Sequence, residues 1–219
     1  MKRVILLVEG PTEEVFINEV LAPHLATFGK WPEVTMVCSR REQGKRKYRG
    51  GGFTYGKFRN DLRLLLQSKP DILTMMVDYY ALGSDFPGWA TKPTQSTCFE
   101  RVAHLETALA NDIGDSRFVP NIVLHEFEAF LFCSPESIVS VLMDDRPFGA
   151  LNEIAKNVGT PEEINDGPET HPSKRLEKLF EGRYQKPLHG PTIAARIGLA
   201  AIRSMCAHFN AWLERLESM

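Results

Sequence analysis

Long apolar runs are scarce in this 219-residue chain. The longest, such as residues 4–8, are far shorter than the roughly 18 residues that a membrane-spanning helix needs. The N-terminus, Met1-Lys2-Arg3, leads at once into a short apolar run without a small-residue cleavage site, unlike a signal peptide. We therefore expect a cytoplasmic protein that makes no contact with a membrane.

Cysteines and nucleotide-binding glycine motifs are also few. The four cysteines are widely spaced and form no CxxC pair, which argues against a zinc ribbon and favours buried free thiols. No GxxxxGK[ST] occurs, and Gly50-Gly51-Gly52 is not followed by a helix-opening Lys-Ser or Lys-Thr. A P-loop or Rossmann enzyme is therefore poorly supported.

What the chain does have is an ordinary globular composition, with 43% hydrophobic and 25% charged residues. Four apolar runs predict strands, and helical spacing of apolar residues between them predicts helices. The expected strands cover 3–8, 34–38, 71–77 and 117–124, and the expected helices cover 13–28 (bent at Pro23), 57–67 and 98–112.

Strands separated by helices predict parallel neighbours, because parallel pairing requires crossovers. We therefore expect an α/β fold with a mostly parallel four-stranded sheet flanked by helices. Residues 1–134 would form this core, with a basic loop at 39–56, and residues 135–219 would form a helical C-terminal extension packed on the same domain.

Acidic residues follow three of the predicted strands. In an open parallel sheet, ligands bind beyond the C-terminal strand ends, where side chains from separate strands converge. Converging carboxylates repel one another unless a cation neutralises them, and such hard oxygen ligands suit Mg²⁺ or Mn²⁺. The acids concerned are Glu9 and Glu13 after the first strand, Asp78 after the third, and Glu126 and Glu128 after the fourth.

Each acid also has a purely structural interpretation. Glu13 is what the positive end of a helix dipole favours, Glu9 suits a turn, and Asp78 suits a loop cap. Glu126 and Glu128 share a face only if their segment is extended. Joint placement at three strand ends favours a metal site over these separate explanations.

The segment from Arg40 to Arg59 is strongly basic, with eight lysines and arginines against one acid, although the whole chain has a net charge of −2. Aromatic residues are interleaved with these cations. Basic side chains neutralise phosphates and aromatic rings stack on unpaired bases, so the composition favours nucleic-acid binding. A solvated loop and a surface for an acidic protein partner remain alternatives. The candidate contacts are Arg46, Lys47, Tyr48 and Arg49.

The stretch VEGPTEE (residues 8–14), followed by an apolar strand ending in Asp78, resembles the Toprim catalytic domain of topoisomerases, primases and overcoming-lysogenization-defect nucleases. The resemblance implies that Glu9 and Asp78 gather one or two divalent metals for phosphodiester chemistry. In the overcoming-lysogenization-defect branch, further acids serve metals, which would recruit Glu13, Glu126 and Glu128.

A second resemblance covers nearly the whole chain. DYYALGSDFPGW (78–89), HEFEAFLF (125–132), PSKRLEKLF (172–180) and residues 197–216 resemble the bacterial Toprim-like domain family of unknown function 4276. That family is similar in setting to two-gene phage-defence systems, in which a small Toprim protein accompanies an ATPase. The usual Asp-x-Asp is here Asp78-Tyr79-Tyr80, so the second aspartate is missing, and Asp85 is a possible substitute.

Two functional hypotheses follow. The first is a Mg²⁺- or Mn²⁺-dependent nuclease acting on DNA or RNA, in which Glu9 doubles as ligand and catalytic residue. Lys174 would offset charge on the scissile phosphate, with Arg175 beside it on the nucleic acid, unless both belong to a solvated helix face. The second is a non-catalytic partner or sensor subunit that binds protein or nucleic acid through its basic loop, which the missing aspartate favours.

Overall fold

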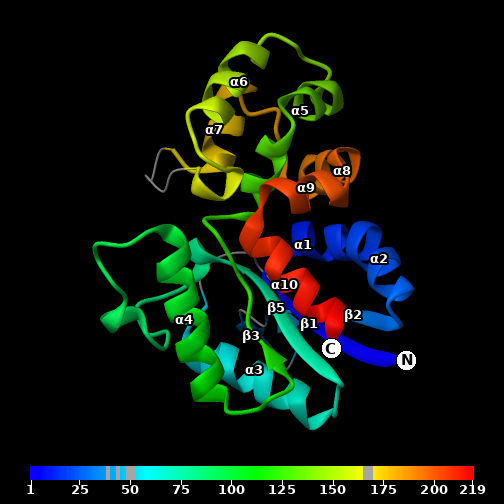
Figure 1. The fold of residues 1–219 in the computed structure, drawn as a ribbon, viewed down its shortest axis with the longest axis vertical. Coiled ribbons are helices and arrows are strands. Elements are labelled where there is room, and N and C mark those ends of the chain that lie inside the picture. Colours follow the sequence, from blue (N-terminus) through cyan, green and yellow to red (C-terminus); the bar gives the residue numbers. More distant parts are fainter. Residues whose placement is uncertain (38–39, 43–44, 48–52, 165–169) are drawn as a thin grey trace.

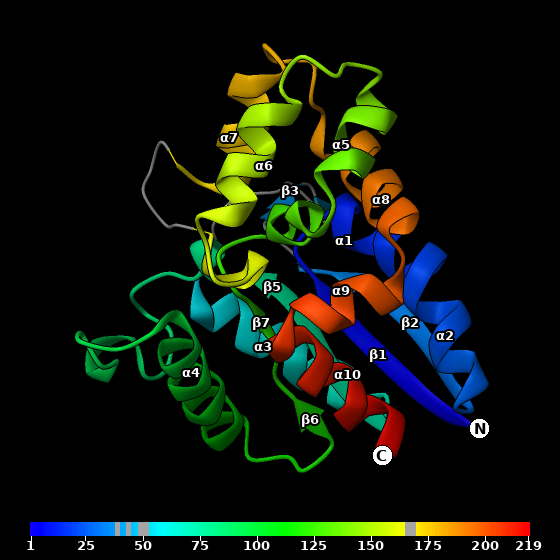
Figure 2. The same ribbon diagram turned by 45° about the horizontal axis from the view of Figure 1, so that its top comes forward.

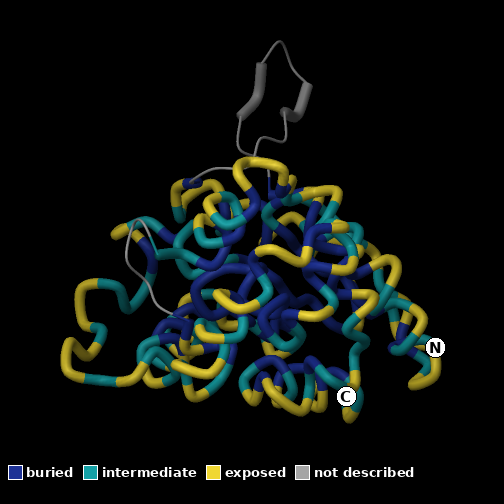
Figure 3. Tube along the Cα trace, turned by 90° about the horizontal axis from the view of Figure 1, so that it is seen from above, coloured by how far each residue is buried: buried dark blue, intermediate teal, exposed yellow. Residues whose placement is uncertain are grey.

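The computed structural model describes residues 1–37, 53–164 and 170–219 in full, and the backbone of 40–42 and 45–47. Within these residues, none of the helices combines the length and the apolar character that crossing a bilayer requires. Figure 3 shows the buried residues gathered along the middle of the molecule and the exposed residues around its outside.

The central sheet is parallel throughout, as the alternation of strands and helices predicted (Figure 1). Its strand order is β2-β1-β5-β6, and β7 pairs with β5 beyond the end of β6. The strands are β1 (Lys2–Val8), β2 (Lys30–Met36), β5 (Ile72–Asp78), β6 (Phe118–Val119) and β7 (Ile122–Val123).

Two strand predictions needed correction. The expected fourth strand is divided into β6 and β7 by Pro120-Asn121, so the sheet has five strands rather than four. Proline has no backbone N–H to donate to a ladder, which explains the break. The second strand begins at Lys30 rather than residue 34, because β2 is an edge strand with Trp31 and Glu33 exposed, and so carries no continuous apolar run.

The predicted helix over 13–28 is a helical run with a distortion at its centre. It consists of α1 (Pro11–Phe16), the π-helical turn η1 (Ile17–Leu21) and α2 (Ala22–Thr27). Pro23 has no N–H for the carbonyl four residues earlier, so the backbone widens in the turn before it. The effect expected of Pro23 thus appears as a π-helical turn immediately before it.

The other helices lie close to their expected places. The segment after β7 is extended at Glu126 and continues as a 3-10 helix from Phe127. The bounds are α3 (Tyr55–Gln67), η2 (Tyr79–Ala81), η3 (Trp89–Thr91), α4 (Cys98–Ile113), η4 (Phe127–Cys133), α5 (Pro135–Leu142), α6 (Phe148–Lys156), η5 (Pro161–Glu163), α7 (Pro172–Leu179), α8 (Lys186–Ile197), α9 (Leu199–Met205) and α10 (Ala207–Ser218).

The sheet has a hydrophobic core on each face, because successive residues of a strand point to opposite sides. Val4, Leu6 and Val8 of β1 pack with α1, α2, η4 and α10. Ile5 and Leu7 pack with α3 and α4 on the other face. Figure 2 shows α10 lying across β1 and β5.

Two contacts tie the C-terminal helices to the rest of the fold. The indole N–H of Trp212 in α10 donates a 2.9 Å hydrogen bond to Thr74 Oγ1 in β5. A Cβ on Gly190 of α8 would lie 3.2 Å from Thr12 and 3.3 Å from Phe127. Glycine therefore lets α8 approach α1 and η4 closely.

Candidate functional site

The acids that sequence analysis selected lie around the C-terminal edge of the sheet. Glu9 directly follows β1, Asp78 is the last residue of β5, and Glu126 stands three residues beyond β7. The strand register aligns these ends, with Val8 opposite Met76 and Asp78 opposite Val123. Topology therefore gathers acids from three strand ends at one edge.

Glu13 turns back from the first turn of α1 toward the end of β1. Its Oε2 accepts a 2.9 Å hydrogen bond from the backbone N–H of Gly10, and the side chain is buried. Burial, together with the charges of Glu9 and Glu128, raises the pKa of Glu13 to about 8. The pKa of Glu13 is thus raised by acids from two other segments, Glu9 after β1 and Glu128 in η4.

Asp78 is fixed by the segment after β7. Its Oδ1 accepts a 3.0 Å hydrogen bond from the backbone N–H of Phe127. Burial raises the pKa of Asp78 well above its usual value, and the charges of Glu13 and Glu9 raise it further. Asp78 therefore lies close enough to Glu13 and Glu9 for their charges to act on it.

Glu126 is extended, and its carboxylate reaches the start of α7. One oxygen accepts from the backbone N–H of Ser173, and the other accepts from Ser173 Oγ at 3.0 Å. His125, immediately before it, has a φ of 63°, in the left-handed region that costs energy for a non-glycine residue. This sharp turn directs the chain from β7 into Glu126.

Lys186, in the first turn of α8, holds Glu126 and Glu128 together. Its Nζ donates to Glu126 Oε2 at 2.9 Å and to Glu128 Oε2 at 3.0 Å. The other oxygen of Glu128 accepts a 3.0 Å hydrogen bond from Tyr184. Both glutamates therefore face one cation, although they are two residues apart.

The charges around Lys186 decide its protonation state. Burial alone would lower the pKa of Lys186, but the negative charges of Glu128, Glu126 and Asp78 raise it above its ordinary value. Burial raises the pKa of Glu128, against the lowering effect of Lys186. An ammonium within the acidic cluster is thus strongly favoured.

Sequence reasoning missed Lys186 and selected Lys174 as the cation. Lys174 lies in the first turn of α7 with its side chain 51% exposed, and its Nζ pairs with Glu177 at 2.5 Å. Lys186 is separated from Glu128 by 58 residues and stands in no acidic or strand-end pattern. Only the packing of α8 against α1 and η4 brings it to the acids.

Arg175 and Asp85 make other contacts in the structure. Arg175 Nε donates to the backbone carbonyl of Thr170 at 2.7 Å, just before its own helix. Asp85 is exposed, and its Oδ2 accepts a 2.7 Å hydrogen bond from the backbone N–H of Tyr55 at the start of α3. Asp85 therefore stabilises the N-terminus of α3.

Tyr80 stands where the second aspartate of Asp-x-Asp was expected. Its hydroxyl lies 3.2 Å from Nδ1 of His125, and its ring contacts that of His171 edge-on at 4.3 Å between centroids. The position is therefore used for packing against two histidines.

The donor set fits a hard divalent cation in its chemistry, since carboxylate oxygens raise one another's pKa and a metal would relieve that repulsion. Among the residues described, however, no three His, Cys, Asp or Glu side chains are arranged to hold a metal together. Metal binding here would require side chains to turn toward one another, or Lys186 to release a carboxylate.

Part of the basic segment forms a two-stranded antiparallel hairpin. The strands are β3 (Arg40–Glu42) and β4 (Lys45–Lys47), with Arg41 opposite Arg46 and Arg40 opposite Lys47. Tyr48 and Arg49 lie outside the described residues. Their roles, and those of the Arg46 and Lys47 side chains, stay predictions.

The cysteines are free where they are described. Cys98, Cys133 and Cys206 form no disulfide, and Cys206 is the buried member of the three. The expectation of free thiols is confirmed at these positions, whereas burial holds at Cys206 alone. Cys38 lies outside the described residues.

Comparison with known proteins finds one family and several solved structures. The model of the family described as "Domain of unknown function (DUF4276)" matches residues 8–217, which confirms the family resemblance of the sequence motifs. No curated protein matches the chain.

The solved structures share little sequence with the chain. The C-terminal region of the Xanthomonas campestris pv. campestris OLD protein is 16% identical, with a TM-score of 0.47, over 100% of this chain and 95% of that one. The C-terminal region of the Burkholderia pseudomallei OLD protein is 17% identical, with a TM-score of 0.45, over 100% of this chain and 98% of that one.

Proposed function

This chain belongs to the DUF4276 family, and we propose that it is a divalent-metal-dependent nuclease of the Toprim type that cleaves phosphodiesters in DNA or RNA. The supporting observation is the electrostatic coupling of acids from separate strand ends. Glu9, Glu13 and Glu128 all raise the pKa of Asp78 at one edge of the sheet. Lys186 lowers the pKa of Asp78 and offsets part of this repulsion. The negative charge that remains in such a cluster is suited to binding a further cation.

The proposed ligands of Mg²⁺ or Mn²⁺ are Glu9, Glu13 and Asp78, with Glu126 and Glu128 beside them. A bound metal would activate a water and neutralise charge on the phosphate. Glu9, the less buried acid at the end of β1, is our candidate general base. Lys186 and Lys174 are candidates for the cation that offsets charge developing on the phosphate.

The remaining proposals concern partners. The basic segment with Arg46, Lys47, Tyr48 and Arg49, together with Arg175, would bind the nucleic acid. An ATPase partner that controls the nuclease in phage defence follows from the family resemblance alone. A cytoplasmic location rests instead on the shortness of the apolar runs in the sequence. Each is independent of the metal assignment.

The test is a cleavage assay on labelled single-stranded DNA, duplex DNA and RNA, in Mg²⁺, Mn²⁺ or EDTA. We expect cleavage that requires the metal and is lost in Asp78→Asn. Asparagine keeps an oxygen acceptor for the N–H of Phe127, so this variant should fold. Equal cleavage by Asp78→Asn, or in EDTA, would refute the assignment.

Two observations favour a second function, a non-catalytic partner or sensor subunit. Lys186 already neutralises Glu126 and Glu128, and Tyr80 replaces the second aspartate. A protein that binds nucleic acid through its basic segment, but neither binds Mn²⁺ nor cleaves any of the three substrates, would support this function instead.

A further inference from the structure

Three side chains after β5 form a cluster, which we call the aromatic shelf: Tyr79, Trp89 and Lys92. The rings of Tyr79 and Trp89 stack with centroids 5.7 Å apart and planes 26° from parallel. Lys92 Nζ lies 3.2 Å from the centroid of Trp89 and 3.3 Å from the hydroxyl of Tyr79. All three are only partly buried, although Tyr79 and Trp89 also pack against the core on the α3 and α4 face of the sheet.

The shelf adjoins the carboxylate cluster. Tyr79 directly follows Asp78, and it also lines a small cavity of about 10 Å³, room for about one water molecule. The opposite wall includes Leu124 and His125, immediately before Glu126. Tyr79 therefore connects the end of β5, which carries Asp78, to the shelf, which packs against the core on the α3 and α4 face of the sheet.

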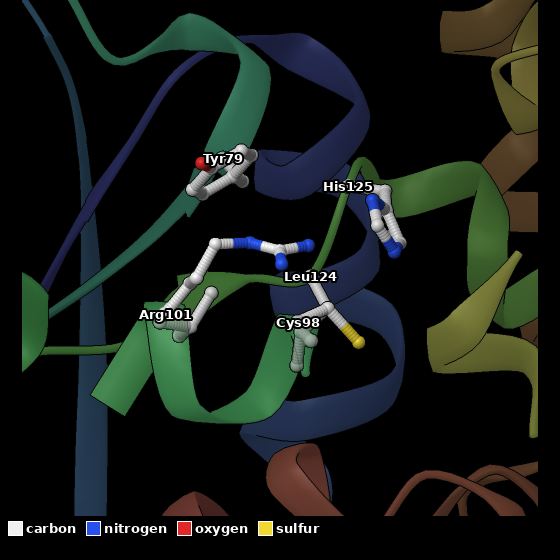
Figure 4. Close-up of a pocket in the computed structure, with 6 residues that line it drawn as sticks. Tyr79, Cys98, Arg101, Leu124 and His125 are labelled. Atoms are coloured by element: carbon white, nitrogen blue, oxygen red, sulfur yellow. The ribbon is translucent and has the colours of Figure 1, made fainter. Parts of the chain in front are cut away.

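A second cation stands at this cavity. Arg101 of α4 lines it and donates from Nη1 to the backbone carbonyl of Ser96 at 2.6 Å. In Figure 4, the Arg101 side chain crosses the cavity, with its guanidinium between Tyr79 and His125. Positive charge thus lies beside Tyr79 in this cavity.

We propose that the aromatic shelf is a subsite for an unpaired nucleobase, so that the substrate class is single-stranded nucleic acid. The inference rests on the proposed nuclease function. A base stacks on Trp89 once Lys92 moves from over its ring to an adjoining phosphate, and Arg101 contacts the next phosphate, which positions the strand near Asp78. Bases within a duplex are already stacked on their neighbours, so a flat aromatic surface selects unpaired ones.

The test measures binding without cleavage, by fluorescence anisotropy of labelled oligo(dT) of about 16 nucleotides in EDTA. We expect Trp89→Ala to weaken binding by about fivefold to 150-fold, the loss of one stacked base. Trp89→Phe should retain most of the affinity. The matched control is Trp31→Ala, because Trp31 is 49% exposed on the edge strand β2, away from the acids.

Tryptophan fluorescence reports on base binding at the shelf directly. This measurement remains informative even if Trp89→Ala fails to fold. Oligo(dT) should quench tryptophan emission of the wild type, and Trp89→Phe should abolish that quenching. Unchanged affinity in Trp89→Ala, quenching that persists in Trp89→Phe, or no binding of oligo(dT) by the wild type would each overturn the proposal.

The same experiment separates this proposal from the proposed function. If Trp89→Ala binds and cleaves like the wild type in Mn²⁺, the shelf is refuted and the nuclease stands. If oligo(dT) binds through Trp89 but no metal-dependent cleavage occurs, the nuclease is refuted and the shelf stands as a binding site.

Discussion

Replacing Lys186 with methionine removes the ammonium that contacts both Glu126 and Glu128. Two buried carboxylates would then face each other without a counter-ion. We expect the metal-free protein to lose about 2–3 kcal/mol of stability, less than a fully buried pair because Lys186 is 39% exposed. Chemical denaturation in EDTA measures this loss.

The matched control is Lys174→Met. Lys174 is 51% exposed, and it pairs with Glu177, three residues further along the same helix. That change should cost less than about 1 kcal/mol. Mn²⁺ should restore more stability to Lys186→Met than it adds to the wild type, since the metal supplies the missing charge. Equal losses in the two variants would contradict the role of Lys186.

Glu13 makes stability depend on pH in the metal-free protein. The unfolded chain releases this proton near pH 4.5, whereas the folded protein holds it to about pH 8. Across that interval the folded state binds more protons, so stability falls as pH rises. Thermal unfolding in EDTA should therefore show a decline that is shallower in Glu13→Gln; identical declines would disprove the shift.

Residue identities at strand ends were predictable, whereas the contacts between them were not. Glu9 and Asp78 were found because each follows a continuous apolar strand, a pattern visible in the sequence alone. Lys186 was missed because its position depends on how closely α8 packs at Gly190. Packing between helices that are far apart in the chain produces no local sequence pattern around a residue such as Lys186, which it brings to the site.

At the scale of elements, α10 anchors the C-terminal helices to the sheet. Trp212 is 5% exposed and bonds Thr74 of β5. Trp212→Ala should destabilise the protein by about 3–5 kcal/mol through the cavity and the lost hydrogen bond. Glu214→Ala, on the exposed side of the same helix, should change stability by less than about 0.5 kcal/mol. Denaturant unfolding of both variants checks the difference.

The accuracy of the element predictions follows burial. The strands expected at 3–8 and 71–77 were nearly exact, because both are central, buried on both faces and therefore continuously apolar. The start of β2 was misplaced, since an edge strand contains solvent-facing residues among its apolar ones. The break between β6 and β7 could have been foreseen from Pro120, which cannot donate to a central ladder.

At the scale of the whole molecule, we propose that residues 135–219 belong to the same folding unit as residues 1–134. One hydrophobic core joins them, since Phe209 and Leu213 of α10 pack in the same cluster as Val4 and Leu6 of β1. The C-terminal part also supplies Lys186 and Ser173 to the acids. The candidate site is therefore complete only in the entire fold.

Nucleic-acid binding through the basic segment predicts a strong salt dependence. Replacing Arg46, Lys47 and Arg49 with alanine should weaken affinity for single strands. The slope of log affinity against log salt should fall in magnitude by about 2, because each phosphate that is no longer neutralised removes roughly 0.7 from it. Anisotropy titrations at several salt concentrations measure it; an unaltered slope would indicate a protein partner for this segment.

The central claim is that the acids at the sheet edge bind a divalent metal, and Mn²⁺ titration calorimetry tests it without a substrate or a partner. We predict saturable binding by the wild type, and its loss in both Glu9→Gln and Asp78→Asn. Absence of Mn²⁺ binding by the wild type, or unchanged binding by the two variants, would contradict the metal site and with it the proposed nuclease.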